Sequence, residues 1–137
     1  MRHLLTLAAV VGIIILTGCN PNSSQTNPET TSKIALDYLQ DAEFESVIKE
    51  KTPVVVMFNA AWCGHCKPLK QDLEKMANEF AGRAKFCVID NNQSIIDEEH
   101  NVGDVMPTTI ILKDGKVLGR VEGNNANQIR EKLNTVL

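Results

Sequence analysis

Residues 54–66 read VVVMFNAAWCGHC, an apolar run that ends in two cysteines separated by two residues. The β-branched and aromatic residues of 54–58 predict a strand that is buried on both faces, as in a parallel sheet. The next apolar residues fall at helical spacing and predict a helix that starts near the cysteines and ends at Gly82: Leu69, Leu73, Met76, Ala77 and Phe80. The cysteine pair therefore stands where a buried strand gives way to a helix.

This position favours a reactive pair of thiols. At a helix N-terminus the free N–H groups and the helix dipole stabilise the thiolate of Cys63, and His65 adds a cation or a hydrogen-bond donor. Cys66 is near enough to attack a mixed disulfide at Cys63, so we expect Cys63 to be the nucleophile and Cys66 the resolving thiol. Gly64 lets a partner chain approach closely. Trp62 offers a flat apolar surface to a substrate, or packs in the fold.

Other roles fit the pair less well. A zinc site needs about four ligands, and beyond this pair only Cys87 and scattered histidines remain in the folded part. Haem attachment requires a histidine directly after the second cysteine, where Lys67 stands. A structural disulfide does not need a strand-to-helix junction with a glycine. The rival that stays open is a non-enzymatic module that binds a metal such as copper through the same two thiolates.

The remaining pattern predicts an α/β domain. Strands are expected at 34–36, 86–89, 108–112 and 117–121, the last two joined by a two-residue turn at Asp114-Gly115. Three helices are also expected: one capped by Asp41 that buries Phe44, Val47 and Ile48, a short one from Ile95 to His100, and a last one capped by Asn124 or Asn125 that buries Ile129, Leu133, Val136 and Leu137. This order predicts a central mixed β-sheet with helices on both faces, closed by a C-terminal β-hairpin and helix.

Three segments together resemble thioredoxins. Residues 55–67 resemble the active-site strand and helix start of that family, and Met106-Pro107-Thr108 resembles its cis-proline loop. Residues 113–116, followed by Gly123, resemble its closing hairpin. The resemblance implies a thioredoxin fold over residues 33–137. It also implies that the protein is a thiol–disulfide oxidoreductase with protein substrates and an upstream redox partner.

The resemblance also implies roles for single residues. The redox group is the Cys63–Cys66 disulfide, and no other cofactor is expected. Pro107 is expected in the cis form, placed against the cysteine pair. The backbone of Met106 is expected to bind an extended substrate segment, with Trp62 as a second substrate contact.

Four positions depart from the family or lie outside its chemistry. Met57 stands where thioredoxins usually carry a buried acid, and Phe86 where the basic partner of that acid is expected, so the route of the resolving thiol's proton is open. Pro68 comes earlier than the family's helix proline and predicts an early bend. Cys87 is expected to be a small buried hydrophobic residue, with a third redox thiol as the alternative.

The two residues between the cysteines bear on the direction of electron flow. Gly-Pro is the thioredoxin pattern, whereas Gly64-His65 is similar to protein disulfide isomerase. The two classes differ in potential by roughly 90 mV. The site therefore favours donating or shuffling disulfides, but many lipid-anchored bacterial relatives are reductants. The direction stays open.

The first residues predict export and a lipid anchor. Residues 1–18 have a short basic start and an apolar stretch that is too short to span a membrane, as in a signal peptide. Leu16-Thr17-Gly18-Cys19 resembles the bacterial lipobox, in which the cysteine is acylated and becomes the mature N-terminus. Residues 19–32 are polar and predict a flexible tether. We therefore expect a lipoprotein on the extracytoplasmic face of a bacterial membrane, periplasmic if the cell is Gram-negative.

The charge of the chain limits its partners. The formal net charge is −3, from 14 basic and 17 acidic residues. This mild acidity argues against nucleic acid or an anionic membrane surface as a partner. The expected partners are protein thiols and disulfides, with the membrane contacted through the lipid on Cys19 and the protein itself a monomer.

Overall fold

A computed structural model describes residues 34–90, 102 and 105–137 of the chain. Its elements are β1 (Asp37–Tyr38), α1 (Asp41–Val47), β2 (Val54–Asn59), α2 (Cys66–Glu79), β3 (Lys85–Asp90), β4 (Thr108–Lys113), β5 (Lys116–Glu122) and α4 (Ala126–Val136). The strands form one mixed sheet in the order β1-β3-β2-β4-β5. β1, β3 and β2 run parallel, whereas β4 is antiparallel to β2 and β5 is antiparallel to β4. The predicted fold class, with its C-terminal hairpin and helix, is confirmed.

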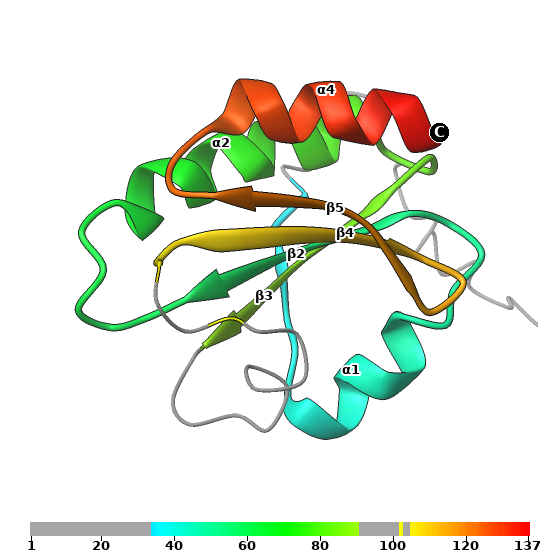
Figure 1. Cartoon of the computed structure of the whole chain (residues 1–137), viewed down its shortest axis with the longest axis horizontal. Helices are drawn as coiled ribbons and strands as arrows, with labels where there is room; N and C mark the ends of the chain where they lie inside the picture. Colours follow the sequence, from blue (N-terminus) through cyan, green and yellow to red (C-terminus); the bar gives the residue numbers. More distant parts are fainter. Residues whose placement is uncertain (1–33, 91–101, 103–104) are drawn as a thin grey trace, which may run out of the picture. The chain divides into compact units, whose positions relative to one another are not determined.

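Helices cover both faces of the sheet, as Figure 1 shows, with α2 and α4 on one face and α1 on the other. Successive side chains of a strand point to opposite faces, so each strand feeds two cores. The α2-side core consists of Leu36, Val55, Met57, Cys66, Leu69, Leu73, Met76, Ala77, Phe80, Phe86, Val88, Ile111, Val121, Ile129 and Leu133. The α1-side core consists of Leu39, Phe44, Val47, Ile48, Val54, Val56, Phe58, Cys87, Ile89, Val102, Ile110 and Leu112.

The first strand begins later than the sequence indicated, and the first helix begins one residue earlier. The edge strand is Asp37–Tyr38 rather than 34–36, because its pairing with β3 begins opposite Cys87. Helix α1 is capped by Gln40 and not by Asp41, which is already its first residue. The backbone N–H of Gln40 donates to Glu43 Oε2 at 3.0 Å, so a side chain three residues into the helix closes its start.

The later elements lie close to their predicted positions, with two corrections. Asn125 caps α4 as expected, since its Oδ1 accepts the N–H of Gln128 at 3.2 Å. Leu137 follows the helix and is exposed, so it does not belong to the buried face. Helix α2 ends at Glu79, before the turn at Gly82 that was expected to end it. The short helix predicted from Ile95 to His100 lies outside the described residues.

The closing hairpin has the turn that its sequence predicts. Asp114 and Gly115 have φ values of 51° and 74°, the left-handed conformation that a two-residue turn of this class needs at both positions. Lys113 and Lys116 pair directly across it. None of the helices in the described part of the chain combines the length and apolar character required to cross a membrane.

Candidate active site

The two cysteines lie on the loop and the first turn that follow β2. Strand β2 is buried along 54–58 and ends at Asn59, at the edge of the sheet formed by the carboxyl ends of the parallel strands β2 and β3. The loop then turns back on itself, because the N–H of Cys63 donates to the carbonyl of Ala60 at 3.0 Å and that of Cys66 to the carbonyl of Cys63 at 3.3 Å. The buried strand therefore fixes where the loop begins, and two tight turns bring it to the helix.

Helix α2 starts near the cysteine pair as predicted, but three residues after Cys63, which was expected at its N-terminus. Its first residue is Cys66 and its N-cap is His65, so Cys63 precedes the helix and does not occupy its first position. Pro68 is the third residue of α2, in the first turn, where backbone N–H groups have no partner within the helix. The helix continues without interruption to Glu79, so Pro68 fits the first turn and does not break the helix.

The cysteines form a disulfide with unequal exposure. The bond joins Cys63 to Cys66, whose Cα atoms lie 5.5 Å apart. Cys66 is 2% exposed and belongs to the α2-side core, whereas Cys63 is half-buried at the edge of that core. A reactant from solution therefore reaches the sulfur of Cys63 and not that of Cys66.

The surroundings of Cys66 are apolar. Met57 and Phe86 are both buried in the α2-side core together with Cys66. Among the described residues, that core contains no buried carboxylate, amine or imidazole. Burial without a charged partner disfavours a thiolate, so the structure gives Cys66 no nearby buried group that would take its proton.

The loop before β4 lies at the same sheet edge as the cysteines. The peptide bond between Met106 and Pro107 is cis, and Pro107 is buried. Thr108 is the register partner of Phe58, so Pro107 adjoins the end of β2. The carbonyl of Pro107 accepts the N–H of Gly123 at 2.7 Å, and Met106 packs against both cores.

Three residues around the disulfide face solvent. Trp62 is 74% exposed, so packing does not explain its large apolar ring. His65 is exposed and its side chain makes no capping hydrogen bond. A Cβ atom added at Gly64 would meet no atom within 4 Å, so the fold itself does not require glycine there. The surface beside Cys63 is therefore open to a second chain.

One polar pair at this edge was not predicted. Asn59 Nδ2 donates to Asp90 Oδ1 at 2.6 Å, linking the last residues of β2 and β3. The signal in the sequence is a polar residue that ends each of two apolar strands. The contact itself depends on the register between them.

The remaining cysteine lies on the other side of the sheet. Cys87 is a free, buried thiol of the α1-side core, as its position in an apolar strand predicted. Burial raises the pKa of its thiol to about 12. Cys87 is therefore protonated at neutral pH and is separated from the disulfide by the sheet.

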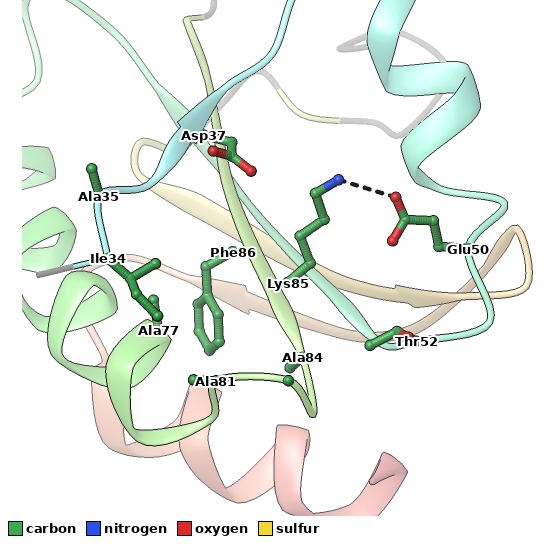
Figure 2. Close-up of a pocket in the computed structure, with 11 residues that line it drawn as sticks. Ile34, Ala35, Asp37, Glu50, Thr52, Ala77, Ala81, Ala84, Lys85 and Phe86 are labelled. Carbon is green, nitrogen blue, oxygen red and sulfur yellow. Dashed lines mark hydrogen bonds and ion pairs between the residues drawn. The ribbon is translucent and has the colours of Figure 1, made fainter. Parts of the chain in front are cut away.

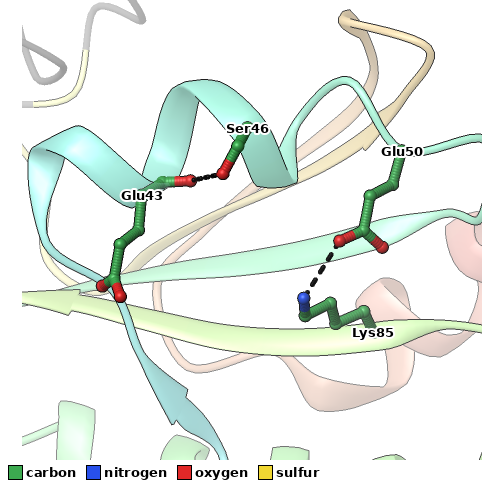
Figure 3. Close-up of polar contacts among 4 residues, drawn as sticks. All are labelled: Glu43, Ser46, Glu50 and Lys85. Carbon is green, nitrogen blue, oxygen red and sulfur yellow. Dashed lines mark hydrogen bonds and ion pairs between the residues drawn. The ribbon is translucent and has the colours of Figure 1, made fainter.

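Two pockets in the described part of the chain lie away from the disulfide. One of about 330 Å³ lies beside the C-terminal end of α2 and the start of β3, with Ile34, Ala77 and Phe86 on its apolar wall (Figure 2). A neighbouring one of about 350 Å³ is lined by Asp37, Glu43 and Ser46, near the ion pair of Lys85 with Glu50 (Figure 3). Within the described ranges, no group of three metal-binding side chains comes together.

The chain is similar to known thioredoxins. The family model described as thioredoxin matches residues 35–135. Thioredoxin-1 of Saccharomyces cerevisiae is 33% identical over 92 residues, covering 67% of this chain and 88% of the relative. Thioredoxin of Haemophilus influenzae is 35% identical over 89 residues, covering 63% and 81%. The crystal structure of thioredoxin from Trypanosoma brucei brucei matches with a TM-score of 0.68 at 32% identity, covering 79% of this chain and 95% of that one.

Proposed function

The chain belongs to the thioredoxin family and is a thiol–disulfide oxidoreductase, and we propose that it works outside the cytosol, anchored to a bacterial membrane by a lipid on Cys19. The Cys63–Cys66 pair is itself the redox group, and members of this family need no further cofactor. Substrates are protein disulfides or thiols.

The proposed order of steps is supported by the unequal exposure of the two cysteines, since Cys63 is half-buried and Cys66 is buried. In the reducing direction, the thiolate of Cys63 attacks a substrate disulfide, a new S–S bond forms, and one substrate sulfur leaves as a thiolate. The thiolate of Cys66 then attacks Cys63, which releases the second substrate thiolate and restores the Cys63–Cys66 disulfide. In the oxidising direction the same steps run backward.

We assign substrate contact to the open surface around Cys63. Trp62 directly precedes Cys63 and has an exposed ring, and Gly64 directly follows Cys63 and leaves space for a second backbone. Met106, which precedes the buried Pro107, offers its backbone at the same sheet edge. An extended segment of substrate, with its disulfide over Cys63, fits these positions.

The location is inferred from residues 1–32, which lie outside the described part of the chain. The apolar stretch followed by Leu16-Thr17-Gly18-Cys19 supports signal cleavage and acylation at Cys19. Two or more acyl chains hold a protein stably on a bilayer. An extracytoplasmic site also suits disulfide chemistry, because disulfides persist outside the reducing cytosol. The Gly64-His65 pair between the cysteines favours a role in forming or isomerising the disulfides of substrate proteins.

A trapping experiment tests the assignment of the two thiols. The Cys66→Ala variant should form mixed disulfides with substrate proteins and stall there, whereas Cys63→Ala should form none. The control variant Cys87→Ala should exchange disulfides at the wild-type rate, because its buried thiol is protonated at neutral pH. Trapped complexes that form through Cys66 when Cys63 is absent would reverse the assignment.

A further inference from the structure

The ends of β2 and β3 are joined by a side-chain hydrogen bond at the edge of the sheet that carries the disulfide. Asn59 and Asp90 are register partners, and Asn59 Nδ2 donates to Asp90 Oδ1 at 2.6 Å. An ionised acceptor makes such a bond stronger than one between neutral groups. Asn59 is half-buried, and it is the polar end of a strand whose other residues are buried and mostly aliphatic.

A short path of bonds connects Asn59 to the reactive sulfur. Ala60 follows it directly and is 4% exposed, and its carbonyl accepts the N–H of Cys63. Cys63 is thus held to the sheet through the end of β2. Cys66 is held separately, because it is the first residue of α2 and is buried in the α2-side core. The position of the Cys63 sulfur relative to the Cys66 sulfur therefore depends on the end of β2, which holds Cys63, and on helix α2, which holds Cys66.

We propose that Asn59 is a positioning residue for disulfide exchange: its bond to Asp90 holds the loop that carries Cys63 where the sulfur of Cys63 meets that of Cys66. The inference rests on exchange by the cysteine pair and not on the lipid anchor. In the oxidised protein the disulfide itself also restrains the loop. In the reduced protein the Asn59–Asp90 bond still restrains the end of β2, beside the backbone pairing of β2 with β3. Its loss should therefore loosen the loop more in the reduced form and stabilise that form relative to the oxidised one.

The equilibrium with glutathione measures this difference. One protein dithiol and one glutathione disulfide give one protein disulfide and two glutathione thiols, with two electrons passing from the protein to glutathione. Asn59→Leu should lower the equilibrium constant about three- to tenfold, as expected for one hydrogen bond. A tenfold change corresponds to a potential about 30 mV less negative.

Swapping the two side chains tests whether the hydrogen bond, and not either residue alone, sets the equilibrium constant. Asn59→Asp alone places two carboxylates together and should lower the constant at least as much as Asn59→Leu. Asn59→Asp combined with Asp90→Asn restores one amide and one carboxylate, and should return the constant to within about twofold of wild type. If Asn59→Leu does not fold, the Asn59→Asp single and double variants make the same test. Glu50→Gln, which breaks the ion pair at the other end of the sheet, is the matched control and should leave the constant unchanged.

The outcomes are distinct. A lowered constant in the single variants that the double variant restores supports the proposal. A constant within twofold of wild type in the single variants overturns it, and so does a loss that the double variant fails to restore, because the hydrogen bond would then not be the cause. A wild-type protein that does not equilibrate with glutathione at all would instead contradict exchange by the cysteine pair.

Discussion

Cys66 and Met57 are buried in one apolar core between the sheet and helix α2, with exposures of 2% and 0%. In the proposed order of steps Cys66 is the resolving thiol, and it must lose its proton before it attacks the mixed disulfide. Since no buried ionisable side chain is found in that core among the described residues, we expect the proton of Cys66 to pass to the departing substrate thiolate or to solvent. We therefore expect resolution of the mixed disulfide to be the slow step of exchange in this protein.

Met57→Asp tests this expectation. A carboxylate at position 57 would lie in the same core as Cys66 and accept its proton, so resolution should be about 10-fold faster, within the range of general-base effects. The buried carboxylate should also lower the free energy of unfolding by about 1–3 kcal/mol. The measurement is the stopped-flow release of glutathione from a protein whose Cys63 carries it as a mixed disulfide.

Met57→Leu is the control for the Met57→Asp experiment, because it keeps the volume and apolar character of the side chain. It should leave the resolution rate unchanged and alter stability by less than about 1.5 kcal/mol. Equal rates for the Asp, Leu and wild-type proteins would show that proton removal from Cys66 does not limit exchange.

Features of this fold that depend on a few adjacent residues can be predicted from the sequence, whereas contacts between distant segments cannot. The apolar run 54–58 and the Asp114-Gly115 turn each depend on a few adjacent residues, and both were located correctly. The sequence places the start of α2 near the cysteine pair but puts Cys63 at the helix N-terminus, because periodicity does not distinguish the turn at Cys63 from the first turn of a helix. The Asn59–Asp90 bond needs the register of two strands that are distant in sequence.

The ion pair between Lys85 and Glu50 gives a pH-dependent contribution to stability. Lys85 Nζ lies 3.0 Å from Glu50 Oε1, and this hydrogen bond raises the pKa of Lys85 above its usual 10.5 (Figure 3). A raised pKa in the folded state means that the contribution is present below pH 10.5 and is lost as the pH rises through the folded value. Both side chains are a third or more exposed, so screening by solvent limits the contribution to about 0.5 kcal/mol.

Glu50→Gln should therefore lower the free energy of unfolding by about 0.5 kcal/mol at pH 7. The difference from wild type should shrink as the pH is raised past 10.5. Urea unfolding at a series of pH values measures it. Glu45→Gln, which breaks the more exposed pair with Lys49, is the comparison and should have a smaller effect. A difference that grows with pH would contradict the assigned sign.

Trp62 should contribute to substrate affinity and not to stability. Because its side chain is 74% exposed, Trp62→Ala should change the free energy of unfolding by less than about 0.5 kcal/mol. It should raise the KM for a protein disulfide several-fold and leave exchange with glutathione nearly unchanged, since glutathione is too small to need the ring. Leu118→Ala removes another exposed apolar side chain, on β5, and should change neither quantity. Equal KM values for both variants would remove Trp62 from the substrate surface.

Cys19→Ala tests the proposed anchor. Without the acceptor thiol the chain receives no lipid, so the protein should leave the membrane fraction or stay as the unprocessed precursor. Its exchange rate with glutathione should match that of wild type, because the cysteine pair is unchanged. Membrane fractionation with metabolic labelling by a fatty acid makes the measurement. Membrane association and labelling that persist in the variant would exclude acylation at Cys19.

His65→Pro tests what sets the potential of the pair. His65 has φ −82°, close to the range that proline adopts, so the fold should accept the change. We expect a cation or donor at His65 to stabilise the Cys63 thiolate and thereby the reduced protein, because the charge disappears when the disulfide forms. Proline supplies neither, so the potential should become more negative by tens of millivolts, where about 30 mV corresponds to a tenfold change in the equilibrium constant. Equilibration with glutathione measures the potential, and thiolate absorbance against pH measures the ionisation of Cys63.

His65→Gln keeps a donor without the charge, so an intermediate potential would assign part of the effect to the hydrogen bond. A potential that is unchanged or less negative in His65→Pro would mean that His65 does not stabilise the thiolate, and the lean toward oxidation would lose its basis.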